Sequence, residues 1–409
     1  MNNFKNYANS FQTVINLRLD RVLKLLSFLK SPQNGMKYIQ VAGTNAKGSV
    51  CAFLQTALTK SGRRTGKYIS PNLIKVNERI TVDNEEISDS DLNRLLGIIE
   101  KEADRVYDEI GEHPTQFEIW TAIAFMYFKE KNCDIVILET GLGGRFDATN
   151  VVSENVMSII TRIDLDHTEY LGDTLSKIAF EKCGIIKKNA VTVTANQEAS
   201  ALAVIKERAK EENSRLIIAP DVSKTDKKHI YEKYVYNGEE IFLGLGGIHQ
   251  LENASIAVSA LEALGVPKDC IAYGLKNAKN PARFELLEEK PPVIFDGGHN
   301  PNGVGSLIKS LERYYEGEKA VFICAFMKDK DIEGCLKLIK EKAKEILFVC
   351  VENNERSAKK EQLTEIADKL GIKNSFFGDV KDALSYAKKE RCLTVICGSL
   401  YLYKDIKKV

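Results

Sequence analysis

The chain has 409 residues, which exceeds the roughly 250–300 residues at which a single hydrophobic core stops growing, so two or three domains are expected. Its 58 Lys and Arg residues balance its 57 Asp and Glu residues. A net charge of +1 gives no support to recruitment of nucleic acid or membrane by bulk electrostatics, so an anionic ligand needs a local site. No apolar run approaches the about 18 residues of a membrane span.

The opening segment and the cysteines bear on where the protein works. The segment MNNFKNYANS is polar and lacks the apolar stretch of a signal peptide. The 9 cysteines are scattered singly, with no CxxC pair and no Cys/His cluster. This pattern favours reduced thiols in a cytoplasmic protein over a disulfide framework or a structural zinc site.

Residues 38–220 alternate short apolar runs with amphipathic stretches. A helix is expected over 9–30 before them. Strands are predicted at 38–41, 134–139, 156–161 and 191–194, and helices at 49–60, 89–110, 117–131, 175–186 and 198–211. Such alternation predicts βαβ units, and therefore an α/β fold: a large, mainly parallel sheet of the P-loop type with helices on both faces.

The second half of the chain changes character twice. Residues 231–243 alternate and carry Asn237-Gly238, a strong hairpin signal, so we expect an antiparallel edge there, followed by a helix at 249–264. Beyond the prolines clustered at 281–301, a shorter series restarts, with strands at 293–296, 320–325, 346–351 and 394–397. This restart predicts a smaller C-terminal Rossmann-like α/β domain, and we divide the chain into 1–283 and 284–409.

A glycine-containing loop, VAGTNAKGSV, follows the first of these strands and opens a helix. In that context backbone N–H groups and the positive helix end converge on an anion, and a lysine reaches its terminal phosphates. The spacing departs from GxxxxGK[ST] because the lysine precedes the second glycine, and a tight turn with an exposed lysine is the alternative. We favour a nucleotide-phosphate loop made of Gly43, Thr44, Asn45, Ala46, Lys47, Gly48 and Ser49.

Two further polar segments follow predicted strands. Glu139 opens ETGLGGRFDATN, and His167 lies in DLDHTEYLG. Ligands bind at the carboxyl ends of parallel strands, and carboxylate and imidazole both bind divalent metals. From the residues alone, an acidic strand end for Glu139 and a surface or capping role for His167 stay open.

The order of these motifs resembles that of the folylpolyglutamate synthase branch of the Mur ligase superfamily, over about residues 40–403. GTNAKGS is similar to the GTNGKGS loop of that family. Ala46 stands where most members have glycine, and an alanine is strained there if the position needs a positive φ. The further matching segments are YISPNL, ETGLGGRFDATN, DLDHTEYLG, EKCGII, GIHQLENA, PARFE, DGGHNPN and CGSLY.

The resemblance implies roles that the residues alone do not. It implies a metal set for two Mg²⁺ ions, made of Ser49, Ser70, Glu139 and His167. It also implies that Lys182, in EKCGII, is carbamylated, whereas a solvated lysine would otherwise be expected. By itself Ser70 would be only a turn residue before a proline.

The later motifs imply contacts with the nucleotide and the amino acid. Asn253 approaches ATP, and Arg283 swings from a hinge onto the γ-phosphate. Asp296 and His299 contact the nucleotide or the incoming amino acid, and Ser399 helps to hold glutamate. The alternatives are purely structural roles: a polar helix start for Asn253, an Arg283–Glu285 ion pair, and a simple helix cap for Ser399.

The segment HPTQFEIW resembles the family motif near the pterin site. There Phe117 stacks on a pteridine ring beside Thr115. A hydrophobic helix that begins with a Thr cap and buries Trp120 is an equally good interpretation.

The implied reaction is ATP-dependent amide ligation. ATP phosphorylates a substrate carboxylate, L-glutamate attacks the acyl phosphate, and phosphate leaves. Lys47, Lys182, Arg283 and His299 are the predicted catalytic residues, and closure of the two domains is expected to assemble the site. Folate or dihydropteroate is the expected acceptor, the expected partners are these small molecules, without nucleic acid or membrane, and the protein is expected to be a monomer.

Three other classes of protein compete with this interpretation. A UDP-MurNAc-type Mur ligase carries a UDP-sugar domain of about a hundred residues before the phosphate loop, but here the loop begins at Gly43. A P-loop NTPase of other function needs a standard loop and a Walker-B strand, and neither is evident. A catalytically silent nucleotide-binding protein would not need Lys47, Glu139, His167 and Arg283 together.

Overall fold

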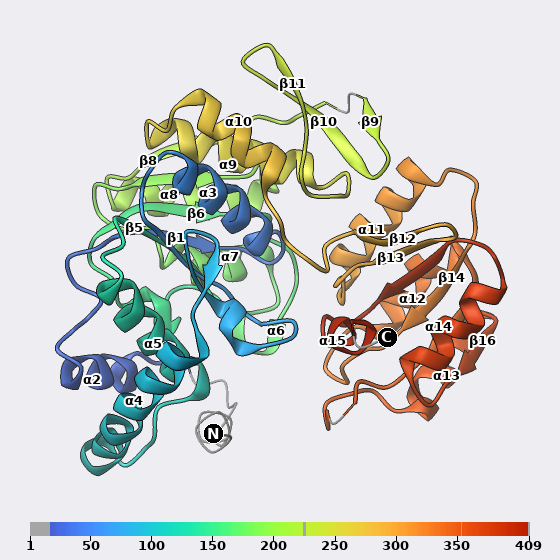
Figure 1. Ribbon diagram of the computed structural model, residues 1–409, viewed down its shortest axis with the longest axis horizontal. Coiled ribbons are helices and arrows are strands. Elements are labelled where there is room, and N and C mark those ends of the chain that lie inside the picture. Colours follow the sequence, from blue (N-terminus) through green and yellow to red (C-terminus); the bar gives the residue numbers. More distant parts are fainter. Residues whose placement is uncertain (1–16, 224–225, 353, 408–409) are drawn as a thin grey trace. The chain divides into compact units, whose positions relative to one another are not determined.

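The computed structural model describes residues 17–223, 226–352 and 354–407, which fold into two compact units (Figure 1). Unit 1 comprises Met1–Val222 and Glu252–Asn277, and unit 2 comprises Ser223–Leu251 and Ala278–Val409. The division differs from the predicted boundary between 283 and 284, because the segment 223–251 belongs with the C-terminal unit. The chain therefore passes from one unit to the other three times.

Unit 1 is built on an eight-stranded sheet with the order β4-β3-β2-β5-β1-β6-β7-β8. Its strands are β1 (Lys37–Ala42), β2 (Thr65–Tyr68), β3 (Ile80–Val82), β4 (Glu85–Glu86), β5 (Ile135–Glu139), β6 (Asn155–Ile160), β7 (Val191–Thr194) and β8 (Arg215–Ile218). The pairs β2–β3 and β3–β4 are antiparallel, and the other pairs of this sheet are parallel. Every residue of β5 is buried, as are all but the first of β1, so both faces of the central sheet are covered. The predicted mainly parallel sheet is confirmed.

Helices and short 3₁₀ turns cover this sheet. They are α2 (Asp20–Phe28), α3 (Lys47–Lys60), η1 (Val76–Arg79), α4 (Asp89–Ile110), α5 (Gln116–Glu130), η2 (Ala148–Val151), α6 (Thr168–Leu171), α7 (Leu175–Cys183), α8 (Ala199–Glu211), α9 (Gln250–Ala263) and α10 (Lys268–Asn277). The helix α3 is buried without interruption from Ser49 to Leu58, as expected for a helix that follows a phosphate loop into the centre of a domain. The predicted helix at 9–30 appears as α2, and its part before residue 17 lies outside the described residues.

Unit 2 contains a six-stranded sheet with the order β12-β13-β17-β14-β15-β16. Its strands are β12 (Glu285–Glu289), β13 (Pro292–Phe295), β14 (Ala320–Cys324), β15 (Ala343–Phe348), β16 (Asn374–Phe376) and β17 (Thr394–Cys397), and its helices are α11 (Pro301–Tyr314), α12 (Ile332–Lys340), α13 (Lys360–Lys369), α14 (Val380–Lys389) and α15 (Leu402–Ile406). All strands are parallel except β12, which pairs antiparallel with β13 at the edge. This is the predicted smaller Rossmann-like sheet.

The predicted hairpin exists but does not lie at the edge of a large sheet. Strands β10 (Tyr231–Tyr236) and β11 (Glu239–Phe242) pair through Asn237-Gly238, and with β9 (Lys227–Lys228) they form a separate three-stranded sheet. Positive φ angles at Asn237 (52°) and Gly238 (82°) match the predicted two-residue turn. The expected antiparallel edge is wrong because the hairpin packs through Ile230 into the core of unit 2.

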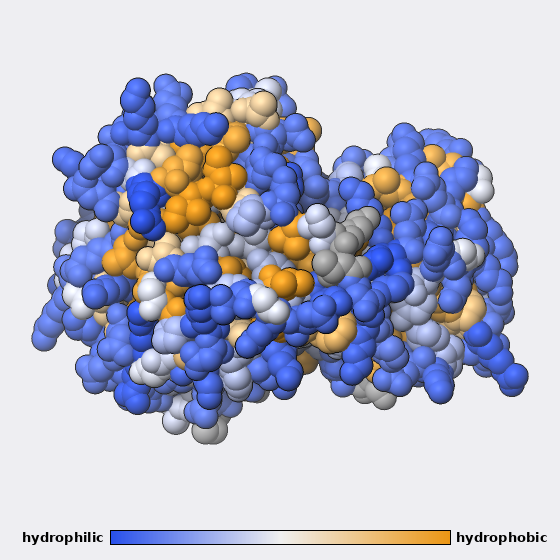
Figure 2. Space-filling model, turned by 90° about the horizontal axis from the view of Figure 1, so that it is seen from above, coloured by the Kyte–Doolittle hydropathy of each residue, from blue (hydrophilic) through white to orange (hydrophobic). Residues whose placement is uncertain are grey.

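The face drawn in Figure 2 is mostly hydrophilic, interrupted by apolar areas. Across residues 17–223, 226–352 and 354–407, no helix combines the length and apolar character that crossing a membrane requires. All nine cysteines are free thiols.

Candidate functional site

Four neighbouring parallel strands of unit 1, in the order β2, β5, β1 and β6, end at one edge of the sheet. The register sets Leu138 beside Tyr68, and Glu139 beside Val41. Chain segments that leave these ends carry Ser70, the phosphate loop and His167, while Glu139 is itself the last residue of β5. The strand order thus brings the predicted metal ligands of unit 1 to a single edge, as the open α/β architecture requires of a ligand site.

The phosphate loop has the backbone that an anion cradle needs. A Cβ on Gly43 would lie 1.8 Å from Thr161 Oγ1, so only glycine allows β6 and the loop to approach so closely. Ala46, the residue before α3, has φ 73° and ψ −12°, in the left-handed region. The position therefore does need a positive φ, and alanine is strained there.

Two lysines meet at this loop. Lys47 Nζ donates to the carbonyl oxygen of Gly43 at 3.0 Å and to that of Thr44 at 3.3 Å. Lys182 Nζ, from α7, donates to the same oxygen of Gly43 at 2.9 Å. Two lysine side chains thus converge on one carbonyl oxygen of the loop, and the positive charge of Lys47 there favours binding of a polyphosphate.

The amino group of Lys182 has a strongly lowered pKa. Its side chain is 4% exposed, and burial, with a smaller contribution from the charge of Lys47, lowers its pKa from 10.5 to about 7. Only the charges of Asp166 and Asp147 and the thiol of Cys183 act in the opposite direction. The predicted alternative, a solvated lysine on a helix, is wrong because α7 packs this face into the interior.

The loop after β5 is held from within by a buried carboxylate that the sequence reasoning did not single out. Asp147 Oδ2 accepts hydrogen bonds from the backbone N–H groups of Gly141 and Leu142 at 2.8 and 2.9 Å. Its other oxygen accepts from the backbone N–H and the hydroxyl of Thr149 at 3.0 and 2.6 Å. Burial still raises the pKa of Asp147. Asp147 therefore fixes the path of the glycines that follow Glu139.

Glu139 is 6% exposed at the end of β5. Lys67, in the adjacent strand β2, lies close enough for the charge of Glu139 to oppose the burial that lowers the pKa of that lysine. A buried carboxylate at a strand end, beside a lysine and a phosphate loop, is a suitable oxygen ligand for a divalent cation. Lys67 was missed because a single lysine in a strand with a glycine carries no motif.

His167 lies in the segment that follows β6. It has φ 50° and precedes α6, and its backbone N–H donates to Asp166 Oδ1 at 2.9 Å. The same oxygen lies 3.9 Å from Nε2 of the imidazole. The segment is tied to the phosphate loop, because the Thr44 hydroxyl donates to the carbonyl oxygen of Asp164 and accepts from its N–H, both at 3.0 Å.

These oxygen and nitrogen donors fit a hard divalent cation. Within the described part of the chain, no three or more His, Cys, Asp or Glu side chains are placed together to hold a metal ion. The predicted set contains only one carboxylate and one imidazole, with hydroxyls for the rest. Such a set leaves coordination positions for nucleotide phosphates and water, which is the usual arrangement for Mg²⁺.

Thr115 caps α5, as the structural alternative predicted. Its hydroxyl accepts from the N–H of Glu118 at 3.3 Å, and Glu118 Oε2 accepts from the N–H of Thr115 at 2.6 Å. Trp120 is 2% exposed in the core. Phe117 is half-buried and its ring lies 5.8 Å from that of Tyr68. A role for Thr115 and Phe117 toward a substrate stays a prediction.

The predicted residues of unit 2 gather at the carboxyl end of β13 and its neighbour β17. Asp296 Oδ1 accepts from the N–H of Gly298 at 2.7 Å, and Oδ2 accepts from that of Phe284 at 2.9 Å. His299 Nδ1 lies 2.9 Å from the carbonyl oxygen of Gly297. Ser399, after β17, is 3% exposed and its hydroxyl accepts from the N–H of Tyr401 at 3.3 Å. The N-cap of α15 is Tyr401 and makes no side-chain hydrogen bond, so the helix-cap alternative for Ser399 is wrong: its hydroxyl bonds the backbone just before the helix.

Arg283 sits on a strained turn. Its neighbours Ala282 and Phe284 have φ angles of 61° and 45°, which are unfavourable for residues with a Cβ. Glu285 bonds Ala282 N–H, Tyr403 and Lys407 instead of Arg283. Among the described residues the Arg283 guanidinium has no ion pair, and it lies against Gly297. The alternative of an Arg283–Glu285 ion pair is therefore wrong, which leaves the guanidinium available to an anionic ligand.

A half-buried histidine accompanies this arginine. Burial lowers the pKa of His249, while Asp296 raises it and Arg283 lowers it further. Its Nδ1 is buried without a hydrogen-bond partner. In unit 1, the predicted nucleotide contact Asn253 is 3% exposed near the start of α9, where Glu252 pairs with Arg162 at 2.6 Å.

Comparisons with known proteins agree with this geometry. Residues 41–261 match the Mur ligase middle domain, and residues 282–400 match the Mur ligase glutamate ligase domain. The chain belongs to the Mur ligase family. It is 34% identical, over 95% of its own length and 94% of the relative, to the dihydrofolate synthase/folylpolyglutamate synthase of Bacillus subtilis.

Solved structures extend the likeness to the whole fold. The folylpolyglutamate synthase of Thermotoga maritima superposes with a TM-score of 0.86 at 35% identity, covering 99% of this chain and 95% of that one. The folylpolyglutamate synthase of Mycobacterium tuberculosis complexed with ADP gives a TM-score of 0.89 at 25% identity, covering 99% and 96%.

Proposed function

We propose that this protein is an ATP-dependent amide ligase that adds L-glutamate to the carboxylate of a reduced folate and to dihydropteroate. One observation carries the proposal. The phosphate loop, Glu139 and the segment that contains His167 all lie at the same edge of the large sheet, because they follow the ends of neighbouring parallel strands. The Bacillus subtilis relative, named for both activities, matches nearly end to end and supports the pair of acceptors. A P-loop NTPase of other function does not explain the Mur ligase glutamate ligase domain, and a UDP-MurNAc-type Mur ligase does not explain the nearly end-to-end match to this relative.

The reaction joins a carboxylate to an amine in two displacements. A carboxylate oxygen of the acceptor attacks the γ-phosphorus of ATP, and ADP leaves with the electron pair of the broken bond. The amino nitrogen of L-glutamate then attacks the acyl carbon, loses a proton, and inorganic phosphate leaves. No protein nucleophile is required, so the protein contributes positioning and charge.

The residues of unit 1 suit the first displacement. Backbone N–H groups of residues 43–49 bind the phosphates, and Lys47 supplies positive charge where negative charge develops. Ser49, Ser70, Glu139 and His167 would hold two Mg²⁺ ions, which neutralise phosphate and carboxylate charge when bound. The glycine turn fixed by Asp147 keeps Glu139 in place.

Carbamylation of Lys182 is a further part of the proposal. A pKa of about 7 leaves a large neutral fraction of the amine at physiological pH. The neutral nitrogen attacks the carbon of carbon dioxide, a C–N bond forms as one C=O π bond opens, and one proton is released, so the neutral amine becomes a negatively charged carbamate. Carbon-13 NMR in labelled bicarbonate should show a carbamate signal that is missing in Lys182→Arg.

The residues of unit 2 suit the second displacement. Arg283 offers an unpaired guanidinium to an anion, and we assign Asp296, His299 and Ser399 to nucleotide and L-glutamate. We further propose that the protein acts as a monomer in the cytoplasm, where its nine free thiols stay reduced.

One assay tests the proposal. The protein is incubated with MgATP and L-glutamate, and with either dihydropteroate or tetrahydrofolate, and ADP release is measured. We expect ADP release that depends on each acceptor, and acceptor-independent release alone would contradict the folate assignment. Glu139→Ala should abolish turnover with an unchanged circular dichroism spectrum, whereas Glu207→Ala, on the exposed side of α8, should keep it.

A further inference from the structure

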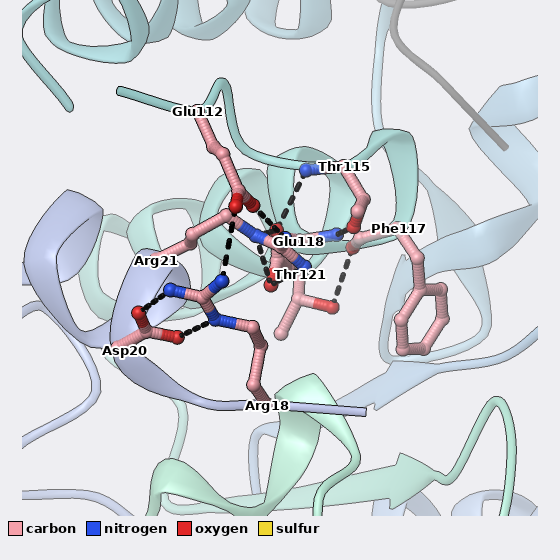
Figure 3. A network of polar contacts seen from close by, with 8 residues as sticks. All are labelled: Arg18, Asp20, Arg21, Glu112, Thr115, Phe117, Glu118 and Thr121. Atoms are coloured by element: carbon pink, nitrogen blue, oxygen red, sulfur yellow. Dashed lines mark hydrogen bonds and ion pairs between the residues drawn. The ribbon is translucent and has the colours of Figure 1, made fainter. Parts of the chain in front are cut away.

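A buried ion pair joins α2 to the start of α5 (Figure 3). The Arg21 guanidinium donates from Nε to Glu118 Oε2 at 3.2 Å and from Nη2 to Oε1 at 3.3 Å. Both residues are 3% exposed. The third guanidinium nitrogen, Nη1, donates to Glu112 at 2.7 Å, and Glu112 also pairs with Arg18 at 3.1 Å. Arg21 is thus held by one buried and one exposed carboxylate.

Glu118 also caps the amino end of α5. Its Oε2 accepts the backbone N–H of Thr115, and its own N–H donates to the Thr115 hydroxyl, so it closes the capping box of α5. A glutamate in a capping box does not need a cation when it faces water. Here it is buried, and a buried carboxylate is stable only when it is paired. Arg21 therefore fixes the conformation of Glu118, and with it the first turn of α5.

The first turn of α5 carries Phe117, whose ring points away from the charge cluster in Figure 3. A Cβ on Gly141 would lie 2.6 Å from the Phe117 ring, so the ring lies directly against the loop two residues after Glu139. The Phe117 ring also lies 5.8 Å from the ring of Tyr68, two residues before Ser70. Thr121 Oγ1 fixes the turn further, because it donates to the Phe117 carbonyl oxygen at 2.8 Å.

We propose that Arg21 is a positioning residue for the acceptor, which acts through Glu118 to hold the Phe117 ring beside the segments that carry Ser70 and Glu139. This rests on the proposed function, since the acceptor is a molecule with a flat heteroaromatic ring that stacks on Phe117. The ring of Phe117 must be fixed for stacking to place the acceptor carboxylate at the phosphate loop. Arg21 acts from the far side of α5 and touches no reacting atom.

The positioning role of Arg21 is tested by measuring the KM of Arg21→Met for each of the three substrates. We expect the KM for tetrahydrofolate to rise at least about tenfold, the KM values for ATP and glutamate to stay within about twofold, and Arg21→Lys to recover part of the loss. Arg94→Met, which removes an exposed arginine of α4, is the matched control and should change none of them. Equal effects on all three KM values would indicate a purely structural role and would overturn the inference.

A double-mutant cycle shows whether Arg21 acts through the ring. If it does, Arg21→Met combined with Phe117→Leu raises the acceptor KM no further than Phe117→Leu alone. If the increases in acceptor KM caused by the two single substitutions multiply in the double variant, the inference is contradicted. Should Arg21→Met fail to fold, Glu118→Gln replaces it in the same cycle. If the unmodified protein releases no acceptor-dependent ADP, the proposed function fails; if it does and Arg21→Met keeps its acceptor KM, only the positioning role fails.

Discussion

Single residues of the phosphate loop decide how closely backbone approaches backbone at the nucleotide edge. Gly43 is forced by contact, since any side chain would collide with Thr161. Ala46 is in the opposite situation, because it tolerates a left-handed φ of 73° that glycine would adopt freely. For Lys182 the unusual property is its pKa, which burial of the side chain lowers. Each of the latter two leads to a measurable consequence.

Ala46→Gly should stabilise the protein. The left-handed region costs alanine about 1–2 kcal/mol, and glycine gives back part of this as entropy of the unfolded chain, so a net gain of about 0.5–1 kcal/mol is expected. The free energy of unfolding from urea titration measures it. Ala203→Gly, at an exposed position inside α8, should instead lose about 1 kcal/mol. A loss at both positions would show that Ala46 is unstrained.

Lys182 should make stability depend on pH. Its pKa is lowered on folding from 10.5 to about 7, so between these values the unfolded chain binds the extra proton and stability rises with pH. One such group contributes a slope of up to about 1.4 kcal/mol per pH unit, with no contribution to the slope below pH 7. Denaturant titrations from pH 7 to 10 under carbon dioxide-free conditions should show a shallower rise for Lys182→Met than for the unmodified protein. Lys206→Met, on α8, should keep the full slope.

At the scale of elements, strand ends and helix starts do the positioning. The capping box of α5 is buried, whereas a capping box normally lies in water, and this burial links α2 to the aromatic ring of Phe117. In unit 2 the hairpin β10–β11 is joined to α11 in a similar way. Glu232 is fully buried and accepts from Arg313 Nε at 3.0 Å and from the Tyr314 hydroxyl at 2.7 Å.

Removing that buried carboxylate should loosen the hairpin. Glu232→Ala removes the buried acceptor that Arg313 and Tyr314 share, and we expect a loss of about 2 kcal/mol in the free energy of unfolding. Glu240→Ala, which breaks only the exposed pair with Lys233, should cost less than about 0.5 kcal/mol. Denaturant unfolding measures both, and equal costs would show that the hairpin does not depend on its buried pair.

At the scale of the whole molecule, unit 2 is discontinuous in sequence. Its core contains Ile230 from the hairpin together with Phe284 and Ile294 from beyond the proline cluster. The stretch 252–277 between them, with α10 and most of α9, belongs to unit 1. A domain with this connectivity cannot be excised as a single C-terminal piece.

This connectivity predicts the behaviour of fragments. A fragment of residues 278–409 lacks Ile230 and Glu232, so it should bind a hydrophobic dye and unfold without a sharp transition. Joining 223–251 to 278–409 through about 20 Gly and Ser residues should restore cooperative unfolding, since such a linker is flexible enough to replace the excised stretch. Thermal unfolding followed by circular dichroism compares the two. Cooperative unfolding of the shorter fragment would contradict the assignment of the hairpin to unit 2.

The sequence by itself determined the α/β class, most strand and helix positions and the motifs of the site, because periodicity and turn chemistry are local. The helix predicted at 89–110 coincides with α4, and the strand at 191–194 with β7. It missed β2, which contains a glycine, the short strands β3, β4 and β9, and the edge strands β8, β12 and β16, which bury little apolar surface. Weak local signals were the cause in each case.

Only the tertiary structure decided which segments meet. The strand order placed Ser70, Glu139 and the phosphate loop on one edge, and packing converted Lys182 from a surface lysine into a buried, easily deprotonated one. Arg21 and Glu118 pair across 97 residues of sequence. Such pairings depend on burial and on the order of the strands, which no local pattern of residues encodes.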